Sequence, residues 1–242
     1  MKKLLGSALL GLLLLASCNP APTPEPDKFP AVTSVSGTVH LGTHWDTSAI
    51  KGHTDADAAG KSLRVWVGPS TGNGTSVDTT VGSDLKYTVT LPTPLDTEVK
   101  PYSVTQFDTC DLTAKTMTEG LKGIDANFSL NAHPETNTIH FLAPVRMTEY
   151  GWLKSTRVVT KLTYANMDGT YLVKGECASG QFPYKTNVDY DLKLKKGWNV
   201  ITLTSTSTAS EDGLSGTTVT NTERNSIGPV DLYAVMQYHE AD

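Results

Sequence analysis

Six side chains that can bind a metal ion lie close together near the start of the chain: His40, His44, Asp46, His53, Asp55 and Asp57. A protein metal site forms where several such nitrogen and carboxylate ligands converge. Residues four apart on a strand face the same side, so His40 and His44 can act together if one strand extends over both. The cluster is therefore a candidate metal site, and a polar surface loop is the alternative.

The segment Asp55-Ala56-Asp57-Ala58-Ala59-Gly60 is similar to the start of a calcium-binding loop. An EF-hand needs an oxygen ligand just before its glycine and a glutamate six residues after it. Ala59 and Trp66 occupy those two positions. The EF-hand pattern therefore fails, and a looser calcium site stays open as an alternative.

A possible catalytic motif is Ser83-Asp84-Leu85-Lys86, which has the Ser-x-x-Lys spacing of penicillin-binding enzymes. That motif works on a helix, where the lysine lies one turn beyond the serine, whereas the residues around Lys86 alternate like a strand. The partner motifs Ser-Asp-Asn and Lys-Thr-Gly are absent from the sequence. We expect a protein that is not an enzyme and that needs no cofactor.

The aromatic residues offer a second kind of binding chemistry. Four tryptophans (Trp45, Trp66, Trp152 and Trp198) and nine tyrosines could supply a platform on which a carbohydrate stacks. The alternative is that the core of the fold takes them up. Trp152 lies in the polar, glycine-bearing stretch 149–152, so we name it as the candidate ligand-binding residue.

The first residues have the form of an export signal. Lys2 and Lys3 precede an apolar run from Leu4 to Ala16. This run is shorter than the ~20 residues that a membrane-spanning helix needs. We expect residues 1–17 to be a signal peptide, and a retained N-terminal helix is the alternative.

The segment Leu15-Ala16-Ser17-Cys18 resembles the lipobox of bacterial lipoproteins. The resemblance implies cleavage before Cys18 and acylation of its sulfur, as with palmitate. Two or three acyl chains on one residue give stable anchoring in a membrane. We therefore expect an exported, lipid-anchored protein of the cell envelope. Asn19 follows the cysteine in place of the aspartate that retains some lipoproteins at the inner membrane, so we expect the outer membrane.

Two further cysteines, Cys110 and Cys177, form an even pair once Cys18 is assigned to the lipid. Such a pair in an exported chain predicts a disulfide. It would close a loop of about 68 residues, for which the chain-entropy model gives roughly 4 kcal/mol of stabilisation. Two free, buried thiols are the alternative.

Charge and composition limit the partners. Cleavage after residue 17 would remove Lys2 and Lys3, the charged residues of that segment, and lower the net charge from −5 to −7. A mildly acidic chain without a basic cluster is a poor ligand for nucleic acid, so we expect none. Residues 18–32 contain the lipidated cysteine and five prolines, which predicts an extended, semi-rigid linker to the membrane.

From Val35 onward the sequence predicts an all-β fold of antiparallel sandwich modules. Short segments alternate apolar and polar residues with a period of two, and glycine, proline, asparagine and aspartate separate them. Leu63, Val65 and Val67, for example, fall on the face opposite Arg64 and Trp66. Only residues 111–127 lack a clear strand pattern, and their spacing permits a short helix.

The first module resembles the prealbumin-like domains named after the regulatory domain of carboxypeptidases. The resemblance rests on residues 36–39, 63–67 and 87–92, and it implies a structural or recognition role. Later strands are expected at 140–147, 156–164, 170–175, 188–194, 198–203, 217–222 and 230–238, with a hairpin turning at Lys195-Lys196-Gly197. We expect a β-sandwich at 33–108, a connecting segment at 109–134 and a second sandwich at 135–242, with one continuous sandwich as the alternative.

The most direct interpretation of these features is a membrane-anchored envelope lipoprotein. We expect it to act as a non-catalytic structural, assembly or binding module, with envelope proteins or polysaccharide as candidate partners. The alternative is a surface lipoprotein that binds a carbohydrate or a metal ion.

Overall fold

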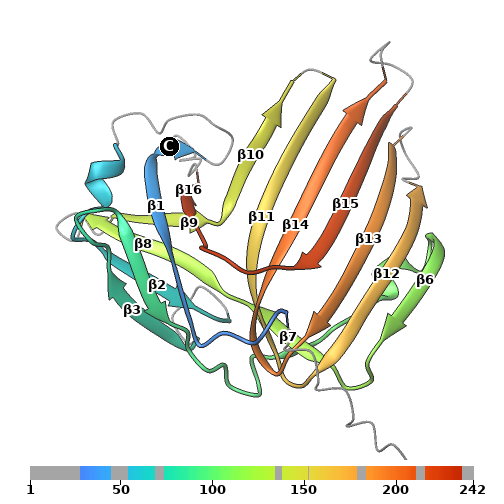
Figure 1. The fold of residues 1–242 in the computed structure, drawn as a ribbon, viewed down its shortest axis with the longest axis horizontal. Helices are drawn as coiled ribbons and strands as arrows, with labels where there is room; N and C mark the ends of the chain where they lie inside the picture. Colours follow the sequence, from blue (N-terminus) through green and yellow to red (C-terminus); the bar gives the residue numbers. More distant parts are fainter. Residues whose placement is uncertain are drawn as a thin grey trace, which may run out of the picture.

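The computed structural model describes residues 28–44, 54–68, 74–133, 138–151, 153–178, 184–210 and 216–235. These residues form sixteen β-strands in two sheets, with two short 3-10 turns at Asp55–Ala58 and Thr105–Phe107 (Figure 1). The prediction of an all-β fold is confirmed. Within the described residues, no helix is long and apolar enough to cross a membrane.

The first sheet has seven strands in the order β3-β2-β8-β9-β16-β1-β4. Neighbouring strands run antiparallel except β16 and β1, which run parallel. The strands are β1 (Ser34–His44), β2 (Ser62–Trp66), β3 (Ser76–Thr80), β4 (Lys86–Thr90), β8 (Asn127–His133), β9 (Thr138–Ala143) and β16 (Leu232–Ala234). The last described strand of the chain therefore lies inside this sheet, between β9 and β1.

The second sheet has nine strands, in the order β5-β7-β11-β14-β15-β13-β12-β6, with β10 also paired to β11. Its strands are β5 (Lys100–Pro101), β6 (Asp111–Met117), β7 (Lys122–Asp125), β10 (Val145–Tyr150), β11 (Lys154–Ala165), β12 (Gly169–Ala178), β13 (Tyr184–Leu194), β14 (Gly197–Ala209) and β15 (Thr217–Asn225). Only β13 and β15 run parallel. In Figure 1 this sheet curls from β10 round to β6.

The turn at Lys195-Lys196 joins two strands that do not pair. β13 ends at Leu194 and β14 begins at Gly197, but β15 lies between them, antiparallel to β14 and parallel to β13. The predicted hairpin is therefore wrong. The side chain of Asn199, on β14, binds the turn instead, because the Lys195 N–H donates to Asn199 Oδ1 at 2.8 Å.

The alternation that predicted strands also predicted which residues are buried. Leu63, Val65 and Val67 are fully buried, whereas Arg64 points outward and pairs with Asp78 at 2.7 Å. Residues 111–127, for which a short helix was permitted, instead form β6, β7 and the start of β8. Pairing decides their structure, because β6 adds to β12 and β7 adds to β11.

The described residues form two hydrophobic cores, and only the first joins the two sheets. The first contains the inner face of the first sheet and also Leu162, Trp198 and Val200 from β11 and β14 of the second. The second core lies on the opposite face of the second sheet, where Phe107 and Leu121 pack on residues such as Leu192 and Ile201. Because β11 and β14 contribute to the first core, the two sheets share packed side chains.

The first sheet combines strands from all three segments that the sequence analysis expected, 33–108, 109–134 and 135–242. β8, β9 and β16 complete the first sheet, although all three come from beyond residue 108. The predicted disulfide is confirmed. It joins Cys110, next to β6, to Cys177 on β12, the strand that pairs with β6.

Candidate functional site

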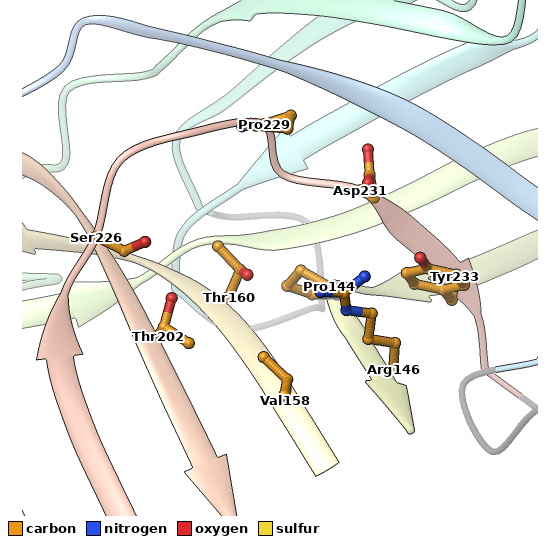
Figure 2. Close-up of a pocket in the computed structure, with 9 residues that line it drawn as sticks. All are labelled: Pro144, Arg146, Val158, Thr160, Thr202, Ser226, Pro229, Asp231 and Tyr233. Carbon is orange, nitrogen blue, oxygen red and sulfur yellow. The ribbon is translucent and has the colours of Figure 1, made fainter. Parts of the chain in front are cut away.

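A cleft of about 340 Å³ lies where the two sheets meet, and we call it the junction cleft. Figure 2 shows the nine residues that line it: Pro144, Arg146, Val158, Thr160, Thr202, Ser226, Pro229, Asp231 and Tyr233. They come from β10, β11, β14 and β16, from Pro144 between β9 and β10, and from the segment between β15 and β16. Segments far apart in the sequence therefore build one site.

The cleft exists because one stretch of chain belongs to both sheets. β9 pairs with β16 in the first sheet, and β10 pairs with β11 in the second. Pro144 separates β9 from β10, and a proline lacks the N–H needed to continue a ladder. Its carbonyl still accepts the Thr160 N–H at 2.8 Å. The chain therefore changes sheets at Pro144, and a corner opens between β16 and β11.

Tyr233 on β16 and Asp231 just before this strand supply the aromatic and acidic groups of the cleft. Leu232 and Ala234 are fully buried, so Tyr233 points to the other face of the strand, toward the cleft (Figure 2). The Thr38 N–H donates to Asp231 Oδ1 at 2.9 Å and fixes that carboxylate. The ring of Tyr233 stacks on His40, with ring centroids 4.8 Å apart and planes 15° apart.

The hydroxyl of Tyr233 stays protonated at neutral pH. Burial raises the pKa of Tyr233, and the negative charges of Asp231 and Asp55 raise it further, while Arg146 works in the opposite direction. A protonated phenol both donates and accepts hydrogen bonds. The cleft thus offers a neutral aromatic group beside one carboxylate.

Arg146 is the cation of the cleft. It is exposed, and it forms no ion pair with another residue that the structure describes. Figure 2 shows Arg146, Asp231 and Tyr233 on one side of the cleft and Thr202 and Ser226 on the other. A guanidinium presents five N–H donors in a planar fork, and hydroxyls donate as well as accept. These groups suit a small ligand that carries several hydroxyl groups.

Two further clefts near β7, of about 180 and 440 Å³, are lined by fewer polar groups that lack an internal partner. Their lining includes Asp125, Thr163 and Glu98. The Thr163 hydroxyl donates to Asp125 Oδ1 at 2.5 Å, and Glu98 accepts from the N–H groups of Leu95 and Thr75 at 2.6 and 2.9 Å. The junction cleft is the better candidate because the guanidinium of Arg146, the carboxylate of Asp231 and the phenol of Tyr233 converge there with three aliphatic hydroxyls.

Three of the predicted metal ligands can be located in full. His40 Nδ1 lies 3.3 Å from Asp55 Oδ2, and Asp55 Oδ1 accepts the Gly42 N–H at 2.7 Å. Asp57 turns away and accepts from the N–H of Thr54 at 2.6 Å. His44 lies at the end of β1, and Asp46 and His53 lie outside the described residues. Within the described part of the chain, no group of three or more ligating side chains forms.

The two tryptophans that the structure describes, Trp66 and Trp198, are buried and are not available as a platform. Trp198 donates its Nε1–H to Pro92 O at 2.8 Å. Trp45 and Trp152, the named ligand-binding candidate, lie outside the described residues, as does Cys18. The aromatic ring of the cleft is Tyr233, which the sequence analysis did not single out. Its position opposite Leu232 and Ala234 in an alternating strand was the available signal.

Ser83 and Lys86 do not have the helical arrangement that the Ser-x-x-Lys motif requires. Ser83 lies in a turn before β4, and Lys86 Nζ lies 3.6 Å from Asp84 Oδ2. Residues 68–72 also have the Gly-x-Ser-x-Gly spacing of a nucleophile elbow, which was not predicted, and all of them except Gly68 lie outside the described residues. An elbow joins a strand to a helix. Here the motif lies between β2 and β3.

No protein-family model, no curated protein and no solved structure matches this chain. The resemblances to the lipobox and to prealbumin-like domains therefore stay predictions from the sequence.

Proposed function

We propose that this protein is a non-catalytic binding module of the bacterial cell envelope, anchored through Cys18, that holds a carbohydrate group in the junction cleft. The observation that supports this proposal is the convergence of Arg146, Asp231 and Tyr233 around one cleft that also presents three aliphatic hydroxyls. Among the structural, assembly and binding roles expected from the sequence, a formed cleft with unpaired polar groups favours binding.

The chemistry of the lining favours a sugar over other small ligands. Sugars offer hydroxyls that donate and accept, and Arg146, Asp231, Thr160, Thr202 and Ser226 can meet them in both roles. Tyr233, stacked on His40, gives a rigid ring against which the C–H face of a sugar can pack.

The cleft can be tested by titrating the lipid-free protein with a panel of neutral monosaccharides and disaccharides, followed by NMR chemical-shift changes. We expect shifts at the lining residues, and at least about ten-fold weaker binding in Arg146→Ala and in Tyr233→Ala, because each loses several contacts. Arg157→Ala is the matched control, since Arg157 lies on the opposite face of β11. Equal affinity in all three variants, or no binding by any sugar, would contradict the proposal.

The anchor is tested separately in cells fed an alkyne-tagged palmitate. We expect the wild-type chain and Ser17→Ala to carry the tag, because the lipobox accepts small residues at that position, and Cys18→Ser to carry none. Label retained in Cys18→Ser would place the lipid on another residue and refute the assigned anchor.

A further inference from the structure

Nine threonines lie on one face of three neighbouring strands of the second sheet, and we call this surface the threonine face. Side chains two apart on a strand share a face, as do cross-strand partners. Thr204 is opposite Thr222, Thr206 is opposite Thr220, and Thr160 is opposite Thr202. The full set is Thr156, Thr160, Thr202, Thr204, Thr206, Thr208, Thr218, Thr220 and Thr222.

The threonine face continues a face that is apolar further down the same strands. On β14 the side chains of Trp198 and Val200 enter the first core, and Thr202 follows on the same side. On β11 Leu162 enters that core before Thr160. The change from core residues to threonine marks where the first sheet stops covering the second, and β11, β14 and β15 extend beyond it (Figure 1).

These strands form a single layer beyond that point. Every residue of β15 is partly exposed, and so are the nine threonines. Neighbouring strands lie ~4.8 Å apart and alternate residues ~6.8 Å apart along a strand. The threonines therefore form a regular array of accessible hydroxyl and methyl groups.

Most of these hydroxyls are available. Thr156 and Thr206 contact each other at 3.2 Å, and Thr156 also donates to Glu149 at 3.3 Å. The other seven threonine hydroxyls form no hydrogen bond within the described part of the chain. They can donate to and accept from an external partner.

The array carries no charge, and the cations at its rim are already paired, except Arg146 in the junction cleft. Arg224 contacts Asp189 at 2.5 Å, Lys174 lies 3.2 Å from the same carboxylate, and Lys154 lies 2.8 Å from Glu149. A polyanion such as an acidic polysaccharide or a nucleic acid needs unpaired cations along its path. The threonine face is therefore suited to a neutral partner.

The threonine face and the junction cleft are one continuous surface. Thr160 and Thr202 belong to both. We propose that the threonine face binds a neutral polysaccharide chain whose end or branch occupies the junction cleft. This inference rests on the proposed function, since it assigns the cleft to one sugar unit and the threonine face to the units that follow.

The test compares oligosaccharides of one to six units from three neutral series, α-1,4-glucan, β-1,4-glucan and β-1,4-mannan, by calorimetry with the lipid-free protein. We expect one series to gain roughly ten-fold in affinity between the single sugar and the hexamer, because several hydrogen bonds add to the first. The triple variant Thr204→Val, Thr220→Val, Thr222→Val should lose this gain and keep the affinity for the single sugar. Valine retains the branched shape that suits a strand.

The matched control is Ser205→Ala, Ser207→Ala, Thr217→Val, which changes the same two strands on their other face and should bind like the wild type. Affinity that does not depend on length would overturn the threonine-face proposal and leave the cleft intact. Length-dependent binding that Arg146→Ala does not weaken would support the threonine face and refute the cleft. A valine variant that changes only the sedimentation of the protein alone would mean that the partner is a second copy, which also overturns the proposal.

Discussion

At the scale of single residues, Tyr87 shows how a few polar contacts hold distant segments together. It is buried on β4, and its hydroxyl donates to the carbonyl of Val230, just before β16, at 2.5 Å. Burial raises the pKa of Tyr87, and the nearby charge of Asp231 raises it further. The phenol therefore stays protonated and keeps donating across the physiological range.

We expect Tyr87→Phe to lower the free energy of unfolding by about 1–3 kcal/mol, because the buried carbonyl of Val230 loses its donor. Urea denaturation followed by circular dichroism measures this loss. Tyr150→Phe is the control, since Tyr150 is 79% exposed and should leave the midpoint unchanged. An unchanged midpoint in Tyr87→Phe would show that this hydrogen bond contributes nothing.

The ionisation of Asp189 makes the free energy of unfolding depend on pH. Burial opposes its ionisation, but Arg224 and Lys174 outweigh burial and lower the pKa of Asp189 below its usual 3.8. A lowered native pKa means that the stabilisation is complete above the unfolded value and disappears as the pH falls through the native value.

We therefore expect Asp189→Asn to be less stable than the wild type at pH 7, by less than about 1 kcal/mol because solvent screens this half-exposed group. The difference should shrink below about pH 4, as both proteins approach the same charge state. Urea midpoints at a series of pH values measure it, and Asp96→Asn at an exposed turn is the control. A constant difference down to pH 2 would show that the loss is not electrostatic.

At the scale of elements, β16 completes the first sheet although it lies near the other end of the chain. It runs between β9 and β1, and Val230, Leu232 and Ala234 are all fully buried in the first core. This short strand thus connects β9 to β1 within the first sheet.

Truncating the central side chain of β16, Leu232→Ala, should cost about 2–5 kcal/mol, because a cavity opens in a packed core. Ile227→Ala, at a 67% exposed position just before this strand, is the control and should be neutral. Thermal unfolding measures the melting temperatures of both variants. Equal melting temperatures would mean that Leu232 of β16 does not stabilise the first sheet.

At the scale of the whole molecule, the two sheets depend on each other. The first core needs Leu162, Trp198 and Val200 from the second sheet, and the segment around Pro144 belongs to both sheets. Residues from both halves of the chain therefore pack into the first core.

From this arrangement we expect residues 28–108, produced alone, to stay unfolded, because the fragment lacks β8, β9 and β16 and exposes the first core. Residues 19–242 are the folded control. Amide dispersion in a two-dimensional NMR spectrum separates the outcomes, and a well-dispersed spectrum from the fragment would establish an independent N-terminal domain.

Alternation within short segments predicted individual strands, and the number of cysteines predicted the disulfide. The alternation at Leu63, Val65 and Val67 indicated both the strand and its buried face, and the even pair Cys110 and Cys177 indicated the disulfide. Residues 111–127 were missed because their strands form by pairing with β11 and β12, which are distant in sequence.

The candidate site was less accessible to sequence reasoning than the fold. His40 and Asp55 do meet, as their spacing suggested, but Asp57 turns away to Thr54. Arg146 gave no signal in the sequence, and the signal for Tyr233 was limited to its position opposite Leu232 and Ala234 in an alternating strand. Only the corner at Pro144 and the insertion of β16 beside β9 bring them to one cleft.

The sequence by itself determined that this chain forms strands and which of their residues face a core, because a period of two and short-range turns depend on local sterics and hydrophobicity. It also indicated the disulfide, because two cysteines remain once Cys18 is assigned to the lipid. Tertiary structure alone decided that β15 separates β13 from β14, that β16 returns to β1, and that a cleft leads onto a face of threonines. Strand order depends on which distant edges bury the most apolar surface and satisfy the most backbone hydrogen bonds. That choice is a property of the whole chain, and no single segment contains it.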